Sequence, residues 1–326
     1  MKVYEIIIKP QSGFGTPIKG DTLFGHFCWQ IAYDETLLGK SLDELLNNYD
    51  SDPFIVFSSA YPKFDGNIYA FKRPDLPLNS LFEPEPNKKE AMKNRKKQKA
   101  KRWMLWKEGK QINSFKELDF TDDSGLLNLA HKIALEELQK QMKRTKPKGF
   151  TVQHTQFHNK INRLTSTTGE EGFAPFSVKQ EVYFPQTELV IFAGIDESID
   201  IEQVIKGLER IGDSGFGKDA STGLGRFDLG DWDKINLDDF FAGDPDACYT
   251  LSPSVPEKNI YKRQFFSPFI RFGRHGDLLA KSGNPFKTPV IMADEGAVFV
   301  PKDQEIFERP FLAEPYPVFQ RQARIQ

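Results

Sequence analysis

The chain has 326 residues, and its 44 Lys and Arg against 46 Asp and Glu give a formal net charge of −2. This balance excludes nucleic-acid binding through bulk charge and leaves local basic clusters as the candidates. The two cysteines, Cys28 and Cys248, define neither a disulfide framework nor a CxxC metal site. No stretch approaches the roughly 20 apolar residues of a membrane helix, and the start does not resemble a signal peptide. We therefore expect a cytoplasmic protein without membrane contact.

The first part of the chain predicts strands around one long helix. Asp21 is a candidate N-cap for a helix over residues 22–33, in which apolar side chains recur at helical spacing. A second, short helix begins at Ser41, where Glu44 completes a capping box. Three segments have the β-branched and aromatic composition of strands: residues 3–9, 53–61 and 67–72.

The middle of the chain begins with a polar stretch over residues 73–110, which includes the basic run KKEAMKNRKKQKAKRWMLWK. A continuous amphipathic helix is predicted over residues 124–144. A further helix is predicted over residues 201–211. The strands predicted for this part cover residues 150–157, 180–185, 188–195 and 226–232.

This order predicts an α+β protein. With an insertion of about residues 73–175 removed, it approaches the βαββαβ order of a ferredoxin-like or RRM-like domain. We expect this domain over residues 1–233, with the insertion supplying helices and a hairpin. Short strands and proline-rich loops then predict a β-rich C-terminal domain over residues 234–326.

A glycine-rich loop precedes the last strand of the first domain. Five glycines fall within the fourteen residues 212–225, together with Lys218, Ser221 and Thr222, and Arg226 follows. Glycines permit positive φ and close approach of the backbone, and successive N–H groups in such a loop can bind an anion. The loop therefore has chemistry suited to phosphate. The alternative is a tight helix-to-strand connection without a ligand.

The segment GDSGFGKD also matches the start of the phosphate-binding loop (P-loop) of nucleoside triphosphatases. In that motif a Ser or Thr follows the lysine, but here Asp219 follows Lys218. The motif also runs from strand to helix, whereas this loop runs from helix to strand. Both departures disfavour a nucleotide-hydrolysing enzyme, and we expect no cofactor and no metal.

Four segments resemble the RAMP superfamily of CRISPR proteins. GTPIKGDTLFGHFCW is similar to its first loop and helix, and RIGDSGFGKDASTGLGRF to its glycine-rich loop. HNKINRLTSTTGEEGFAPFSVKQEVYF resembles its recurring middle segment. The C-terminal FIRFGRHGDLLAKSGNPFKTPVIMADEGAVFV looks like the Csm-four subunits of type III-A complexes, in the Cas-five group. The resemblance covers the whole chain, least diagnostically over residues 88–110.

This resemblance implies a non-catalytic, RNA-binding structural subunit of a CRISPR effector complex. It implies contact with the 5′ handle of CRISPR RNA, with a large polymerase-like subunit and with a neighbouring backbone subunit, and only indirect contact with target RNA. The tip at residues 165–172 matches a hairpin that disrupts the guide–target duplex. The implied RNA-binding residues are Lys19, Gly20, His158, Asn159, Asn162, Arg163, Gly215, Gly217, Lys218, Ser221, Gly223, Gly225 and Arg226.

Other residues leave alternatives open. His26 or His158 could serve a metal-independent endoribonuclease of the same superfamily, although no acid/base partner adjoins His26. His154 and His158 could share a metal only on a helix, and their segment predicts a strand. The basic residues 88–110 are either a solvated helix or linker, or an arm on RNA or the large subunit. Trp103 and Trp106, at helical spacing, could anchor such an arm.

Overall fold

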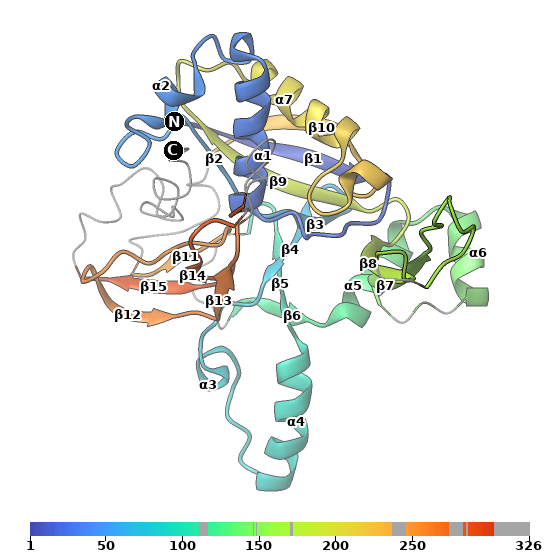
Figure 1. Ribbon diagram of the computed structural model, residues 1–326. Helices are drawn as coiled ribbons and strands as arrows, with labels where there is room; N and C mark the ends of the chain where they lie inside the picture. Colours follow the sequence, from blue (N-terminus) through green and yellow to red (C-terminus); the bar gives the residue numbers. More distant parts are fainter. Residues whose placement is uncertain are drawn as a thin grey trace.

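A large antiparallel sheet organises the protein (Figure 1). The computed structural model describes residues 1–110, 117–145, 147, 149–169, 172–236, 246–273, 283–284 and 286–302. Along the sheet the order is β10-β1-β9-β3-β4-β5-β6, with β2 also paired to β9. These strands are β1 (Lys2–Pro10), β2 (Ile55–Phe57), β3 (Tyr61–Phe64), β4 (Ile68–Lys72), β5 (Trp103–Lys107), β6 (Asp119–Thr121), β9 (Glu188–Ile195) and β10 (Phe227–Ile235). The expected combination of helices with a sheet is confirmed.

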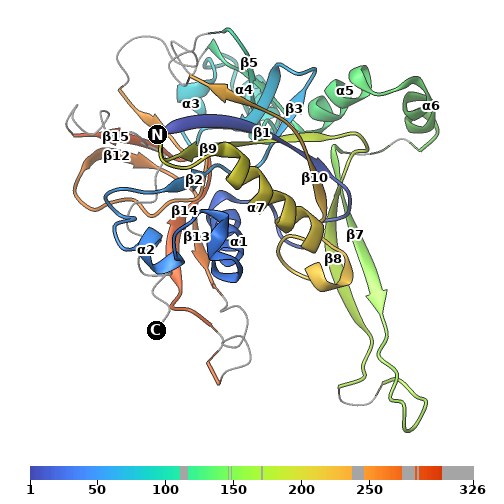
Figure 2. The same ribbon diagram turned by 90° about the horizontal axis from the view of Figure 1, so that it is seen from above.

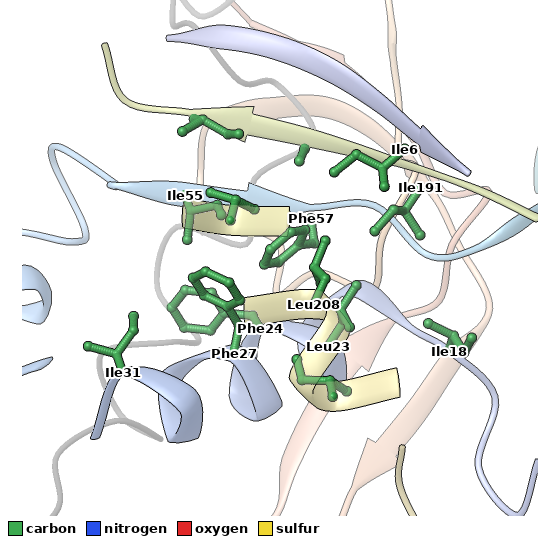
Figure 3. Packing of buried hydrophobic residues seen from close by; sticks show 14 of the residues in the cluster. Ile6, Ile18, Leu23, Phe24, Phe27, Ile31, Ile55, Phe57, Ile191 and Leu208 are labelled. Carbon is green, nitrogen blue, oxygen red and sulfur yellow. The ribbon is translucent and has the colours of Figure 1, made fainter. Parts of the chain in front are cut away.

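Helices α1 (Gly20–Tyr33) and α7 (Ile201–Ser214) cover one face of this sheet (Figure 2). Alternation along a strand sends successive side chains to opposite faces. In β1, Ile6 and Ile8 pack toward the helices, whereas Ile7 packs on the other side. Figure 3 shows Phe27 and Leu208, from the two helices, in the first of these cores. Each such buried side chain contributes roughly 1.5–3 kcal/mol.

The structure corrects the expected start of the first helix. Asp21 is not its N-cap, because Lys19 holds that position and α1 begins at Gly20. Asp21 lies in the first turn, where its carboxylate accepts a hydrogen bond from Arg271, 2.7–2.8 Å away. The side chain therefore joins the helix to the C-terminal region.

Two other local expectations have different outcomes. The capping box of Ser41 and Glu44 is confirmed, and it begins α2 (Leu42–Leu46). The predicted continuous helix over residues 124–144 is wrong, because α5 (Asp123–Ile133) and α6 (Glu136–Thr145) are separate. The chain becomes extended at Ala134, and Gln139 donates to its carbonyl group. The break directs α6 back, so that both helices contribute to one buried cluster around Phe150.

The basic stretch, for which the sequence left open a helix, a linker or a binding arm, forms two different elements. Its first part is α4 (Lys88–Ala100), which follows the short α3 (Leu78–Leu81), and its second part is strand β5. Trp103 and Trp106 therefore lie on a strand, not at helical spacing. Trp106 is buried in the core on the side of the sheet that faces away from α1 and α7, and Trp103 donates through Nε1 to Asp123. Strands β5 and β6 extend the main sheet from within the expected insertion.

The described C-terminal residues form small sheets that pack against the rest of the protein. They are β11 (Cys248–Tyr249), β12 (Tyr261–Phe265), β13 (Pro268–Arg271), β14 (Val290–Ala293) and β15 (Val298–Pro301). Tyr61 donates to the carbonyl of Leu251, and Tyr249 donates to the carbonyl of Lys72. Strand β10 continues to Ile235, two residues past the expected domain border. The C-terminal region is thus tied closely to the main sheet.

Two elements project from the molecule in different directions. One is α4, which extends below the sheet in Figure 1, and the other is the ribbon of β7 (Thr151–His158) and β8 (Phe176–Tyr183) in Figure 2. The two strands pair antiparallel from Thr151–Tyr183 to His158–Phe176. Within the described part of the chain, no helix combines the length and apolarity needed to cross a membrane.

Candidate nucleic-acid interface

The glycine loop connects α7 to β10 and interlocks with the loop that precedes α1. The N–H of Gly225 donates to the carbonyl of Gly13, and the N–H of Arg226 donates to the Ser12 hydroxyl. The N–H of Lys218 donates to the Thr16 hydroxyl at 3.0 Å. Two loops that contact each other through residues 202 to 214 positions apart in sequence therefore form one surface. The resemblance pointed to both loops, but not to the contacts of Ser12 and Thr16.

Several glycines of this loop are required by close packing. At Gly225 φ is 73°, and an added Cβ would overlap the backbone of Phe216. At Gly215 φ is 93°, and a Cβ would lie 2.5 Å from the carbonyl oxygen of Leu224. Gly223 differs, because its φ is 96° but no atom lies within 4 Å of its Cβ position. Tight loop geometry thus accounts for most of these glycines without a ligand.

The backbone of the loop is largely engaged within the protein. Every N–H in residues 215–218 and 222–226 is donated to an internal acceptor, including those of Gly217 and Gly223. At most, the N–H groups of residues 219–221 are left for an anion. The loop therefore offers a short 3₁₀ turn, Ala220–Thr222, rather than a long row of free amides.

Basic and hydroxyl side chains are exposed around this turn. Lys218, Ser221 and Arg226 all lie at the surface. The side chain of Lys218 is 62% exposed, and its ammonium is 3.8 Å from the carboxylate of Asp219. This arrangement places exposed charged groups on a backbone held by internal hydrogen bonds, which suits contact with phosphates.

His26 supports the loop from beneath. Its Nε2 accepts a hydrogen bond from the N–H of Gly217 at 3.2 Å, and its ring packs on that of Phe216, with centroids 4.7 Å apart. Burial lowers the pKa of His26, which favours the neutral ring that can accept this bond. The nitrogen that a general base would use is therefore occupied by the loop.

Lys19 and Gly20 lie at the contact with the C-terminal region. Lys19 forms ion pairs with Asp294 and Glu295, and its side chain is only 18% exposed. Burial alone lowers the pKa of Lys19, but the charge of Glu295 and the hydrogen bond to Asp294 outweigh it and raise the pKa. A Cβ at Gly20 would overlap Phe57 and Ser252. The geometry of both residues favours a structural role over an RNA contact.

The other candidates lie toward the far end of the ribbon. The ring of His158 stacks on Phe176 at 5.2 Å. Asn162 bonds to Thr167 and, through its side chain, to the N–H of Leu164, whereas Asn159 and Arg163 are exposed. Glu170 and Glu171, at the expected tip, lie outside the described residues. This end of the ribbon presents apolar and basic groups together.

Apolar exposure on the ribbon is a feature that the sequence interpretation did not include. Phe157 is 80% exposed and Leu164 is 96% exposed. The Lys160 ammonium lies 5.7 Å from the Phe176 ring. Residues 151–158 are mostly polar, with isolated apolar side chains among them. This sequence pattern could have indicated a strand whose apolar side chains stay exposed.

The structure joins some of the candidates and separates others. Phe14, in the first loop, exchanges two backbone hydrogen bonds with Glu181 of β8, so the base of the ribbon adjoins the glycine loop. His158 ends β7 at the other end of the ribbon, and Arg163 follows in the connection between the two strands. Figure 2 shows this end of the ribbon away from the body of the protein. The candidate interface therefore has two parts. One is a loop platform, formed by the first loop (residues 11–19) and the glycine loop (residues 215–226), and the other is the projecting ribbon.

Neither a protein-family model nor a curated protein sequence matches the chain. Solved structures do match. A chain of the Csm3–Csm4 subcomplex in the type III-A CRISPR-Cas interference complex aligns with TM-score 0.53 and 15% identity, covering 92% of this chain and 93% of that one.

Two Csm1–Csm4 cassettes align in the same way. The cassette with AMPPNP has TM-score 0.51 and 14% identity, covering 93% of this chain and 89% of that chain. The cassette with pppApA has TM-score 0.50 and 13% identity, covering 93% and 88%. The protein therefore shares its fold with chains of these CRISPR assemblies.

Proposed function

We propose that the protein is a non-catalytic structural subunit of a type III-A CRISPR RNA-guided effector complex, acting in antiviral defence. It binds the 5′ handle of CRISPR RNA, docks a large polymerase-like subunit and an adjacent backbone subunit, and meets target RNA indirectly. The observation that carries this proposal is the interlocked loop platform, which exposes Lys218, Ser221 and Arg226 on a fixed backbone. The fold shared with chains of Csm1–Csm4 and Csm3–Csm4 assemblies supports it.

We also infer a ferredoxin-like RAMP core. In chain order β1, α1, β3, β9, α7 and β10 follow the βαββαβ pattern, and both helices cover one face. This core corresponds to the domain expected over residues 1–233, with the insertion of about 73–175 carrying α4 and the first strand of the ribbon, β7. The β-rich residues 234–326 form the second domain of this proposal.

The mechanism is positional. The guanidinium of Arg226 can bind a phosphate through two N–H groups, whereas the ammonium of Lys218 acts as a point charge. The hydroxyl of Ser221 can donate to a phosphate or ribose oxygen. Because internal hydrogen bonds already hold the loop, binding RNA requires little further ordering of its backbone.

A face of the C-terminal region suits a protein partner. On the β13–β14 ribbon, Ile270 and Ile291 are directly paired across the strands, and both are exposed. Phe272 and Phe286 are exposed nearby in sequence, whereas Phe299 is buried in the region's own core. Exposed apolar side chains of this kind favour a docking surface, and we assign it to the large subunit.

Filter binding to handle RNA tests the function. The double variant Lys218→Ala with Arg226→Ala should bind a single-stranded RNA carrying a CRISPR-repeat handle more weakly than the native protein. Each lost phosphate contact should reduce the magnitude of the log–log salt slope by about 0.7. A matched variant, Lys40→Ala with Lys206→Ala, removes two exposed charges elsewhere and should leave the slope unchanged.

The same titration distinguishes the alternatives. A scrambled RNA of equal length should bind less tightly than the handle, and the handle RNA should be recovered intact. Unchanged affinity and slope in the double variant would refute the loop as the binding site. Discrete cleavage products that disappear in His158→Ala would instead indicate an endoribonuclease.

A further inference from the structure

Helix α4 is held firmly at its base although it projects from the protein (Figure 1). The Arg73 guanidinium donates to the carbonyl groups of Gln98 and Lys101, at 2.7 and 2.9 Å, and so caps the end of the helix. Asn94 donates to the carboxylate of Glu85. The helix therefore presents a defined surface, rather than the mobile linker considered from the sequence.

The surface of α4 that faces away from the protein is basic. The half-buried residues Ala91, Asn94 and Gln98 lie on one side of the helix. At roughly 100° per residue, Lys93 and Lys96 point to the opposite side. Lys89 lies on that opposite side as well, whereas Arg95, Lys97 and Lys99 lie on the remaining arc, and all of these basic side chains are exposed. The only acidic residue of α4, Glu90, lies at the edge of this arc.

The positive charge of this region far exceeds the negative charge within it, although Arg102, beyond the helix, pairs with Asp123. Residues 88–110 contain eleven Lys and Arg against two Glu, a net charge of +9. Because the whole chain carries −2, the remaining residues carry −11. The ion pairs formed by the described residues involve none of the exposed basic side chains of α4. A helix that merely needs solubility would intersperse both signs.

The pattern of side chains selects the kind of partner. A helix that docks in a protein groove presents apolar residues at a spacing of three and four, but here Met92 is the one large apolar side chain exposed on α4. Positive charge over a wide arc instead matches a polyanion with regularly spaced charges. A nucleic-acid backbone provides such charges, and contacts to it do not depend on sequence.

We propose that α4 is a second RNA-binding element, which contacts the phosphate backbone independently of sequence. Its site is separate from the loop platform, because α4 connects β4 to β5, which lie several strands away from β10 in the sheet. The choice of RNA as the polyanion rests on the proposed function. Any single-stranded RNA that passes this side of the protein gains electrostatic contact with the helix.

Salt-dependent binding to an unstructured RNA tests this element in the full-length protein. The variant carries Lys89→Gln, Lys93→Gln, Lys96→Gln and Lys99→Gln, since glutamine retains good helix propensity. With a 30-nucleotide polyuridine probe, the magnitude of the log–log salt slope should fall by up to about 2.8, from four contacts at about 0.7 each. The pair Lys93→Gln with Lys96→Gln should give about half of this change.

The control variant changes four exposed lysines elsewhere to glutamine, at positions 40, 206, 258 and 262, with the same loss of net charge. Its slope should equal that of the native protein. Equal slopes for the native protein and the α4 variant would overturn the proposal. It would also be overturned if poly-L-glutamate, but not polyuridine, lost affinity for the α4 variant, because the partner would then be an acidic protein.

The proposals for the two RNA sites can be tested independently. The α4 variant should keep the preference for handle over scrambled RNA, and the Lys218 and Arg226 variant should keep most of the slope measured with polyuridine. If the native protein showed no preference for the handle RNA, the proposed function would be refuted. If its salt slope still depended on the lysines of α4, the proposal for α4 would nevertheless be supported.

Discussion

The glycine loop and α4 both place basic side chains at the surface, but in opposite structural settings. Around Lys218 and Arg226 the backbone is enclosed by contacts with the first loop and with His26. The exposed lysines of α4 lie on a helix that contacts Arg73 near its base and Glu85 along one side. Substitutions in the loop should therefore change the stability of the core. Substitutions of the exposed lysines of α4 should change its surface charge with little effect on stability.

The largest effect is expected where the loop is most tightly packed. Gly225→Ala would force a Cβ onto the backbone of Phe216 and place alanine at φ 73°. Overpacking and backbone strain together should lower the free energy of unfolding by about 3 kcal/mol or more. Urea denaturation followed by circular dichroism measures this change.

Gly223→Ala is the matched control. Its φ is also positive, but the space around its Cβ position is open, so only the strain of about 1 kcal/mol should appear. Equal losses in the two variants would show that packing between the loops does not matter.

An intermediate effect is expected at His26. His26→Leu should leave the N–H of Gly217 without its acceptor, which costs about 1–3 kcal/mol. Since burial lowers the pKa of His26 in the folded protein, the unfolded chain binds the proton more readily. The advantage of the native protein over the variant should be full above pH 6.5, and should decline as the pH falls below 6.5 toward the lowered pKa.

Urea denaturation at several pH values measures this difference, with His154→Ala on the exposed ribbon as the comparison. That variant should leave the stability of the loop unchanged at every pH. A constant difference between the native protein and His26→Leu would contradict the role of a neutral ring.

The smallest effect on stability is expected in α4. Lys93→Glu places an acidic residue four positions from both Lys89 and Lys97, and each new pair stabilises a helix by about 0.2–0.5 kcal/mol. Thermal unfolding should therefore show an unchanged or slightly raised midpoint, while binding to polyuridine decreases. Lys40→Glu is the control for binding, and a clear loss of stability in Lys93→Glu would show that the core does depend on α4.

Local sequence patterns determined much of the framework. The run over residues 188–195 predicted a strand, and β9 has these bounds. The prediction was possible because this strand is buried on both faces and its sequence is therefore almost continuously apolar. The capping box at Ser41 and the helix-to-strand position of the glycine loop also follow from short-range rules. Such features depend on neighbours in the chain, which a sequence displays directly.

Tertiary contacts decided the features that the patterns missed. Asp21 has the chemistry of an N-cap, but its partner Arg271 is 250 residues away, and Lys19 is likewise engaged by Asp294. Trp103 and Trp106 stand at a helical spacing, but pairing with β4 and β6 holds them on a strand. The resemblance indicated the glycine loop, whereas only the fold decided which of its N–H groups remain for a ligand. Burial and ion pairing depend on distant segments that no local pattern encodes.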